Sequence, residues 1–362
     1  MTHLRWGYTT GTCAAAAAKA AVRVLCGRSL GETHSPEPVV VTLPDGERVS
    51  MPVARVRAEG RFAEAAVRKD AGDDPDITNG LEVVVRVERR IDGRMVFAAG
   101  PGVGTVTRPG LMVPPGEAAI NPVPRAMICA AIREVSDGGF TISVSIPGGQ
   151  ELAQRTFNPR LGVVGGLSIL GTTGRVRPFS CSALRQSLRC TLDVAAACGV
   201  RSPVLVPGHY GERAARALFR LSEVQVIPVG NEWGYVLGEA GGMGFERVLL
   251  VGHPGKLAKL AAGHWDTHSA RSPAATEVIR QMVPQQFAAC FSNAATVEEA
   301  VRAMTQSARR EVFSRIAERI RDAVEEFIQK RFAAAVILVD MQGEVLASAG
   351  DMTSWTRVEN ES

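Results

Sequence analysis

The sequence has few aromatic residues, little net charge and no long apolar run, and each shortage excludes a class of protein. Aromatics make up 5% of the 362 residues, which argues against a surface that stacks single-stranded nucleic acid. A net charge of +4 is too small for a protein built around a phosphate backbone, so we expect no nucleic-acid partner. The longest clean apolar run, residues 333–339, is far too short to span a bilayer, and we expect no membrane partner.

The spacing of the cysteines and the low number of lysines are also informative. The seven cysteines are scattered, odd in number and without a C-x-x-C pair, which argues against a disulfide framework and a structural zinc site. With no apolar signal core near the first residue, this pattern predicts a cytoplasmic protein. Only five of the 41 basic residues are lysines. Arginine suits a bidentate grip on carboxylates, although a codon bias would produce the same skew.

The patterning of turns and apolar residues predicts an α+β and α/β protein in three parts. Residues 1–148 read as an α+β domain rich in antiparallel strands, in which Asp92-Gly93 predicts a hairpin between residues 81–87 and 95–98. From there the order strand, glycine turn, helix recurs, which predicts an α/β domain with mainly parallel strands over residues 149–270. Residues 271–362 read as a helical C-terminal region with a terminal hairpin.

Residues 7–13 (GYTTGTC) run directly into an alanine-rich segment and predict a loop that ends in a helix cap. Thr10 or Thr12 is the expected cap, and Gly27 is the expected end of the helix. A helix start carries unpaired N–H groups and the positive end of the dipole, which together favour an anion. An ordinary buried helix with a good cap explains the same pattern.

Other glycine-rich turns offer further candidate sites, each with a plain structural alternative. Residues 252–257 (GHPGKL) lack the first glycine of a nucleotide P-loop, with Leu250 in its place, and the hydroxyl residue after the lysine, with Leu257 in its place. The loop can still present Lys256 to another anion, or be a simple strand-to-helix turn. Residues 101–111 and 121–125 could brace a polyanion or act as rigid scaffold.

No metal site is expected from the spacing. The acidic run at residues 69–76 lacks the ligand spacing of a calcium loop and reads either as an acidic turn or as carboxylates in a site. His264 and His268 stand four apart around Asp266, but the H-E-x-x-H pattern is missing. Spacing alone therefore indicates only an α/β enzyme that binds an anionic small molecule.

Taken as a set, these motifs resemble the CbiD family, the cobalt-precorrin-5B C-1 methyltransferases of anaerobic cobalamin biosynthesis. The resemblance runs in order from residue 7 to about residue 270 and covers little of the tail. It rests on residues 7–13, 70–76, 102–111, 121–125, 145–149, 156–162, 169–174, 252–257 and 267–269.

The resemblance implies that S-adenosylmethionine donates a methyl group to C-1 of a flat tetrapyrrole that carries many carboxylates, giving cobalt-precorrin-6A. Cobalt then belongs to the substrate, so no protein-bound metal is implied, and transient hand-over with other corrin-pathway enzymes is expected. By residue type and motif position we expect catalytic roles for His253 and His268. The expected substrate-binding residues are Thr10, Gly11, Thr12, Arg108, Arg125, Arg160 and Lys256. The expected cofactor-binding residues are Gly171, Thr172, Thr173, Gly252 and Gly255.

Two residues depart from the pattern of the family. Pro254 stands where a small apolar residue is expected, and His209 stands where an asparagine is expected. Either change could alter a loop without changing the reaction. A non-catalytic corrinoid-binding or carrier protein remains the alternative hypothesis from another functional class.

Overall fold

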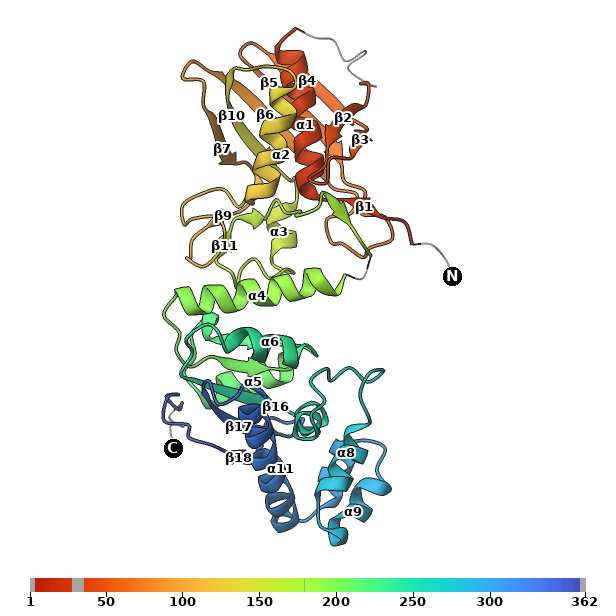
Figure 1. Cartoon of the computed structure of the whole chain (residues 1–362), viewed down its shortest axis with the longest axis vertical. Helices are drawn as coiled ribbons and strands as arrows, with labels where there is room; N and C mark the ends of the chain where they lie inside the picture. Colours follow the sequence, from red (N-terminus) through yellow and green to blue (C-terminus); the bar gives the residue numbers. More distant parts are fainter. Residues whose placement is uncertain (1–3, 28–35, 179, 359–362) are drawn as a thin grey trace. The chain divides into compact units, whose positions relative to one another are not determined.

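The computed structural model describes residues 4–27, 36–178 and 180–358. The chain forms two units, the first ending at Cys181 and the second beginning at Ser182 (Figure 1). Each unit has its own sheet and its own buried core, and each is described by itself. In the part of the chain that is described, no helix has the length and apolar character that a membrane crossing requires.

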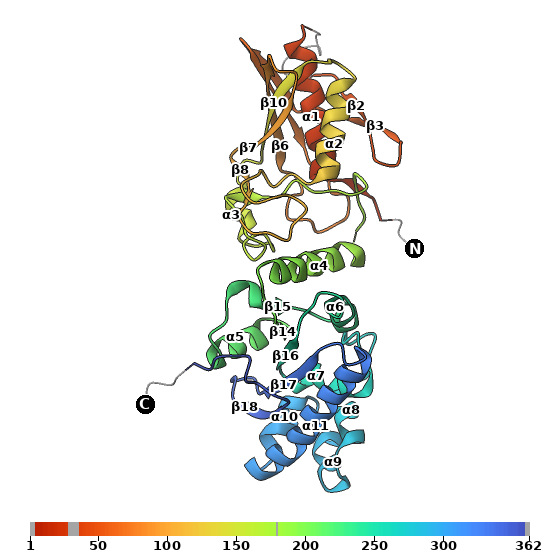
Figure 2. The same cartoon turned by 60° about the vertical axis from the view of Figure 1, so that its left-hand side comes forward.

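The sheet of the first unit is mostly antiparallel. Its order is β4 (Arg55–Glu59), β5 (Phe62–Arg68), β6 (Glu82–Arg90), β10 (Gly139–Ser145) and β7 (Met95–Ala99). Only the β10–β7 pair is parallel. Helices α1 (Thr10–Leu25) and α2 (Pro122–Arg133) lie side by side against this sheet (Figures 1 and 2). The smaller elements are β1 (Gly7–Tyr8), β2 (Val39–Thr42), β3 (Arg48–Met51), β8 (Gly102–Val103), β9 (Thr105–Val106), α3 (Gly149–Ala153), β11 (Val163–Val164), β12 (Gly166–Leu167) and β13 (Arg175–Val176).

The alanine-rich helix is the centre of this unit. Residues 10–22 of α1 are buried throughout, because alanine side chains let the sheet on one side and α2 on the other approach the helix closely. The helix ends as expected: Gly27 has a φ of +76°, the left-handed conformation that commonly follows a C-terminal turn.

The hairpin predicted at Asp92-Gly93 is wrong. The two strands are present as β6 and β7, but β10 lies between them and pairs with both, antiparallel with β6 and parallel with β7. Local turn chemistry therefore predicted the turn but not the partner, which comes from a distant part of the chain.

The sheet of the second unit is mostly parallel, as the repeated strand, turn and helix predicted. Its order is β15 (Val226–Pro228), β14 (Val204–Val206), β16 (Arg247–Gly252), β17 (Ala333–Val339) and β18 (Val345–Ala349). Only β18 is antiparallel to its neighbour, and β17 and β18 form the expected terminal hairpin. The helical elements are α4 (Cys181–Ala197), α5 (His209–Leu218), η1 (Glu223–Gln225), α6 (Trp233–Ala240), α7 (Pro254–Leu257), η2 (Ala258–Ala262), α8 (Ala275–Met282), α9 (Gln285–Ser292), α10 (Val297–Ala303) and α11 (Gln306–Phe327).

Both faces of this sheet are covered, which explains why its strands are apolar runs without alternation. On one face, Leu205, Leu250 and Val336 share a cluster with residues of α4, α6 and α11. On the other face, Leu249 and Ile337 pack with residues of α5 and of the C-terminal segment. The fold is therefore a mixed α/β one. The three-part division at residues 148 and 270 stays a prediction as a statement about domains, and β17, which lies beyond residue 270, pairs with β16.

Gly211 allows α5 to pack closely against the carboxyl end of β16. A Cβ at this position would lie 2.5 Å from the Val251 carbonyl oxygen, which is backbone and cannot move aside. We therefore expect Gly211→Ala to destabilise the second unit by roughly 1–3 kcal/mol. Denaturant unfolding followed by tryptophan fluorescence measures this, because Trp233, Trp265 and Trp355 all lie in this unit.

Gly238 in α6 is the matched control, since a Cβ there meets nothing within 4 Å. Gly238→Ala should be neutral or stabilising by up to about 1 kcal/mol, because alanine favours a helix over glycine. Equal loss of stability in both variants would contradict the close-packing explanation.

Candidate functional site

The start of α1 is held by the segment at residues 169–174. Thr10 Oγ1 donates to the Leu170 carbonyl oxygen (3.2 Å) and accepts from the Leu170 N–H (2.9 Å). Thr12 Oγ1 donates to the carbonyl oxygen of Gly174 over 2.7 Å. The helix cap is Thr9, whose Oγ1 accepts from the Thr12 N–H (3.2 Å), so the expectation of Thr10 or Thr12 as cap is wrong. The two expected capping hydroxyls instead link distant parts of the chain.

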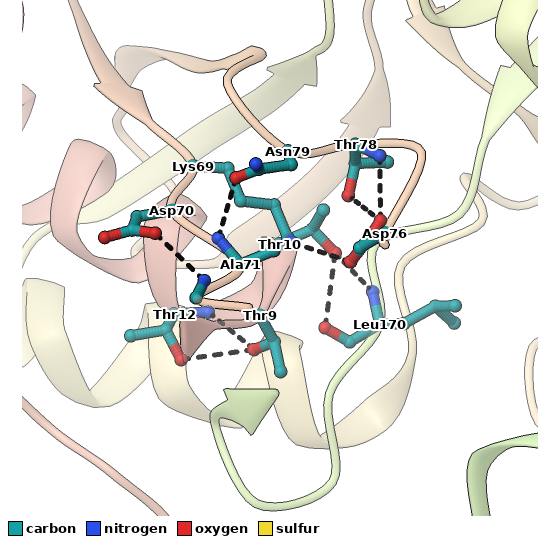
Figure 3. A network of polar contacts seen from close by, with 11 residues as sticks. Thr9, Thr10, Thr12, Lys69, Asp70, Ala71, Asp76, Thr78, Asn79 and Leu170 are labelled. Carbon is teal, nitrogen blue, oxygen red and sulfur yellow. Dashed lines mark hydrogen bonds and ion pairs between the residues drawn. The ribbon is translucent and has the colours of Figure 1, made fainter. Parts of the chain in front are cut away.

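The loop at residues 69–79 closes the other side of this helix start (Figure 3). The Tyr8 N–H donates to the Asp70 carbonyl oxygen at 2.8 Å, and a Cβ on Gly7 would lie 2.1 Å from the carbonyl carbon of Ala71. Only glycine allows so close an approach of two backbones. The motifs at residues 7–13, 70–76 and 169–174 therefore meet at one place.

A buried ion pair fixes the acidic loop. The Lys69 side chain is 1% exposed, and its ammonium donates to Asp76 Oδ2 at 2.6 Å. The other oxygen of Asp76 accepts from the N–H (2.7 Å) and the hydroxyl (2.6 Å) of Thr78. Burial opposes ionisation of Asp76, but Lys69 and these hydrogen bonds outweigh it and hold the pKa of Asp76 below its ordinary value. Nearby Cys13 is inert, since burial raises its pKa to about 12.

Most polar groups of the helix start thus bind the protein itself. The Gly11 N–H donates to the Leu170 carbonyl oxygen (3.0 Å), and the Cys13 N–H donates to that of Thr9 (3.1 Å). The expectation that Thr10, Gly11 and Thr12 contact substrate stays a prediction, and in this structure both hydroxyls and the Gly11 amide have partners within the chain.

Gly171, Thr172 and Thr173, expected to bind the cofactor, continue the same segment. Gly171 has a φ of +136°, and a Cβ on it would lie 2.3 Å from Thr9 Oγ1, so it is needed for packing against the helix cap. Thr172 and Thr173 are exposed, and Thr173 Oγ1 donates to the Arg175 carbonyl oxygen at 3.2 Å.

The expected carboxylate-binding arginines differ in how far they are engaged. The guanidinium of Arg125 already has three partners within the chain. It donates to the Ile120 carbonyl oxygen (2.7 Å), the Ala118 carbonyl oxygen (3.1 Å) and Glu117 Oε2 (2.7 Å). Arg108 and Arg160 are half-buried on two loops that interlock.

The interlocking is close. Arg108 Nη1 donates to the Arg160 carbonyl oxygen at 3.1 Å, and Thr107 donates to that of Gly162. The stem of Arg108 lies over Gly162, where a Cβ would meet its Cγ at 2.5 Å. The motifs at residues 102–111 and 156–162 therefore form one surface.

In the second unit, the carboxyl ends of the parallel strands lie at one edge of the sheet. Chain connections leave β14 toward β15 and leave β16 toward β17, so the neighbouring pair β14–β16 is a topological switch point, where α/β sheets bind ligands. Gly208 follows β14 and Gly230 follows β15, and a Cβ on either would meet no atom within 4 Å. Sequence reasoning did not assign a role to these two glycines, although each follows a strand.

His253, the expected catalytic residue after β16, uses both ring nitrogens inside the protein. Nδ1 accepts from the Gly255 N–H (3.0 Å), so Nε2 carries the proton that it shares with Glu298 Oε2 (3.2 Å). Burial lowers the pKa of His253, and the hydrogen bond to Glu298 opposes that effect. His253 is therefore the N-cap of α7, and Pro254 is the first residue of that helix. Gly252 lies against Pro207, whose ring a Cβ would meet at 2.7 Å.

His268, the other expected catalytic residue, lies exposed on the loop after η2. Its ring Nδ1 accepts from the Ala270 N–H at 3.2 Å, and the backbone N–H of His268 donates to Asp266 Oδ1 at 3.0 Å. In both histidines, accepting a further proton at Nδ1 means breaking a bond from a backbone N–H.

Lys256 reaches toward the loop after β15. Its ammonium donates to Asn231 Oδ1, which also accepts from Thr267 Oγ1 at 3.2 Å. Burial lowers the pKa of Lys256, and Asp266 partly offsets this. Sequence reasoning missed Asn231 because a lone asparagine after a strand carries no motif. Across the described residues, no group of histidine, cysteine and acidic side chains is arranged to hold a metal ion.

Comparisons with known proteins bear on both units. Residues 1–178 match the family model CbiD, and residues 266–350 match the model described as CbiD, C-terminal domain. A cobalt-precorrin-5B C(1)-methyltransferase of Syntrophotalea carbinolica is 47% identical, over 98% of this chain and 100% of that protein. A protein of the same name from Desulfitobacterium hafniense is 40% identical, over 94% of this chain and 89% of the relative.

One solved structure is also similar in sequence. The crystal structure of a cobalamin biosynthesis protein (cbiD) from Archaeoglobus fulgidus shares 32% identity, over 74% of this chain and 83% of that chain. The TM-score is 0.39.

The Lys69–Asp76 pair predicts how the stability of the first unit depends on pH. Because the folded pKa of Asp76 lies below the ordinary value of 3.8, its contribution is complete above that pH and is lost as pH falls through the lowered pKa. Asp76→Asn leaves the buried ammonium unpaired and should cost about 3 kcal/mol at neutral pH. The variant should then lose less additional stability on acidification than the wild type.

Urea unfolding followed by circular dichroism, between about pH 3 and about pH 7, measures both effects. The exposed Asp137 provides the control, since Asp137→Asn should leave the unfolding curve close to that of the wild type. An Asp76→Asn variant as stable as this control would contradict the assigned role of the ion pair.

Proposed function

The chain belongs to the CbiD family, and on that premise we propose that it transfers a methyl group from S-adenosylmethionine to C-1 of cobalt-precorrin-5B. The observation that carries this function is the similarity over nearly the whole chain, 98%, to a protein named cobalt-precorrin-5B C(1)-methyltransferase. The chain is accordingly a methyltransferase of cobalamin biosynthesis, and its product is cobalt-precorrin-6A. We propose the identity of the methyl donor and the residues that bind it.

We place the methyl donor at the carboxyl edge of the second sheet. Open space over Gly208 and Gly230 lets a flat or extended ligand approach the backbone, and the switch point lies beside β14. Gly252 and Gly255 belong to the same edge, where they shape the loop after β16 around Pro207 and His253. When bound, S-adenosylmethionine supplies a methyl group that its sulfonium has already activated. The residues here are therefore left with binding and orientation.

The carboxylates of the tetrapyrrole need cationic partners. Arg108 and Arg160 are our candidates in the first unit, because they are half-buried and share one surface. Arg125 supports this role less well, since its guanidinium already binds Glu117 and two carbonyl oxygens. Thr10, Gly11, Thr12 and the segment with Gly171, Thr172 and Thr173 stay proposed contacts, and their present hydrogen bonds favour a role in shaping the loops.

We also propose a cytoplasmic location, supported by seven free cysteines, of which Cys181 and Cys198 are exposed and stay reduced in such a compartment. Direct hand-over of the tetrapyrrole between this protein and other corrin-pathway enzymes is a further proposal. Its basis is the place of the reaction inside a sequence of steps on one macrocycle.

Titration calorimetry with S-adenosylmethionine and S-adenosylhomocysteine, with and without cobalt-precorrin-5B, tests the donor. We expect both sulfur ligands to bind and the affinity to rise when the tetrapyrrole is present, followed by methyl transfer in the complete mixture. Tetrapyrrole binding with no response to either sulfur ligand would overturn the proposed donor and favour a corrinoid carrier.

The two histidines have different expected roles, which substitution can separate. His268→Ala should lower kcat by about 100-fold with little change in melting temperature, if the exposed ring accepts a proton during the reaction. His253→Ala should lower the melting temperature, because it removes the cap of α7 and the partner of Glu298. An unchanged kcat in His268→Ala would exclude it as the base.

A further inference from the structure

Three lysines of the described chain are buried, and one of them stands apart. Lys19 donates to Glu134 at 2.6 Å and Lys69 to Asp76 at 2.6 Å, so each has a carboxylate partner. Lys259 is 5% exposed, and no described carboxylate forms an ion pair with it. Since removing an ammonium from water costs several kcal/mol, a buried one is normally paired with an anion.

The partners that Lys259 does have are neutral. Its ammonium donates to Ser272 Oγ at 2.9 Å and to the Thr267 carbonyl oxygen at 3.3 Å. Ser272 Oγ donates onward to the carbonyl oxygen of His268 at 2.9 Å. Neutral oxygens satisfy hydrogen bonds without neutralising the charge, so the positive charge of Lys259 remains unbalanced in this structure.

A second lysine joins the same network. Lys256 donates to Asn231 Oδ1, Thr267 Oγ1 donates to the same oxygen at 3.2 Å, and the Thr267 carbonyl accepts from Lys259. Lys256 likewise has no ion pair with any carboxylate that the structure describes. Asn231 and Thr267 thus hold two ammonium groups in one neighbourhood, which we call the dilysine site: Lys256, Lys259, Asn231, Thr267 and Ser272.

The surrounding charges leave this site positive. Asp266 is the acidic group that acts on both lysines, but Arg271 Nη1 binds it at 2.8 Å. Burial lowers the pKa of Lys259, and the charge of Lys256 lowers it further, so the two cations oppose each other. An anion between them would relieve both penalties.

The dilysine site also lies where a ligand is expected. Lys256 is on α7, directly after β16, and Asn231 follows β15, so the site borders the carboxyl edge of the sheet. Sequence reasoning assigned Lys256 to substrate, but it assigned nothing to Lys259, Asn231 or Ser272.

We propose that the dilysine site binds a carboxylate of one of the two reactants and that Lys259 is a positioning residue for it. That carboxylate belongs either to a side chain of the tetrapyrrole or to the amino-acid part of the methyl donor, and the experiment distinguishes these sources. The identity of the reactants rests on the proposed function; the binding of an anion does not.

Steady-state kinetics of the full chain tests the site with Lys256→Met and Lys259→Met, which remove the charge at nearly constant volume. We expect the KM for one of the two reactants, either cobalt-precorrin-5B or S-adenosylmethionine, to rise about 10-fold or more. The KM for the other reactant should stay the same, and kcat should change less. The reactant whose KM rises is the source of the carboxylate. Lys256→Arg, which keeps the charge, should recover part of the loss, and Lys330→Met on an exposed residue is the control for losing one charge.

Thermal unfolding separates this role from a structural one. Lys259→Met removes an unbalanced buried charge, so its melting temperature should equal or exceed that of the wild type. A lower melting temperature together with unchanged KM values would overturn the proposal, because Lys259 would then serve only to hold the loop at residues 267–272.

A simple polycarboxylate distinguishes failure of this site from failure of the proposed function. Citrate, compared with chloride at equal ionic strength, should raise the melting temperature of the wild type and of Lys330→Met but not of Lys259→Met. That result without methyl transfer would uphold the anion site and reject the proposed reaction. The opposite result would be lysine variants that transfer the methyl group with normal KM values and are still stabilised by citrate. That result would reject the dilysine site and leave the proposed reaction standing.

Discussion

Close packing at glycines around the start of α1 is the constraint on which the first unit depends. Gly7 lies against the backbone of Ala71, Gly171 lies against the side chain of the capping Thr9, and a Cβ on either glycine would clash. These approaches bring three segments far apart in sequence to one helix end. They explain why glycines gather there, while the hydroxyls of Thr10 and Thr12 donate to carbonyl oxygens of the neighbouring segment.

This constraint also limits what the helix start can do. An N-terminus with free amides attracts anions, but here Leu170 accepts from the Gly11 amide and Thr9 accepts from those of Thr12 and Cys13. In this structure the motif therefore holds the neighbouring loops in place. In the second unit, open backbone follows two parallel strands at Gly208 and Gly230, where a Cβ would meet no atom within 4 Å.

The sequence allowed the class of fold to be predicted better than the pairings within it. Runs such as Val248–Val251 between glycine turns predicted parallel strands, because a strand covered on both faces is apolar throughout. The hairpin at Asp92-Gly93 was wrong, because turn chemistry is local whereas the insertion of β10 depends on the whole core. The candidate site residues likewise divide into those that a local motif indicates and those that depend on the whole fold. Motif position predicted Lys256, whereas Asn231 and Lys259 join the proposed site only through contacts in space.

The scarcity of lysine gives the remaining ones physical meaning. A codon bias would by itself produce a chain with few lysines, yet four of the five are buried or half-buried, and only Lys330 is exposed. A buried ammonium is compact and donates in three directions, whereas a planar guanidinium needs more space and a flat partner. Lys19 and Lys69 are buried in this way, and each forms an ion pair with a carboxylate. Lys259 has the same burial without a described carboxylate partner, so an anionic reactant at the dilysine site would balance its charge.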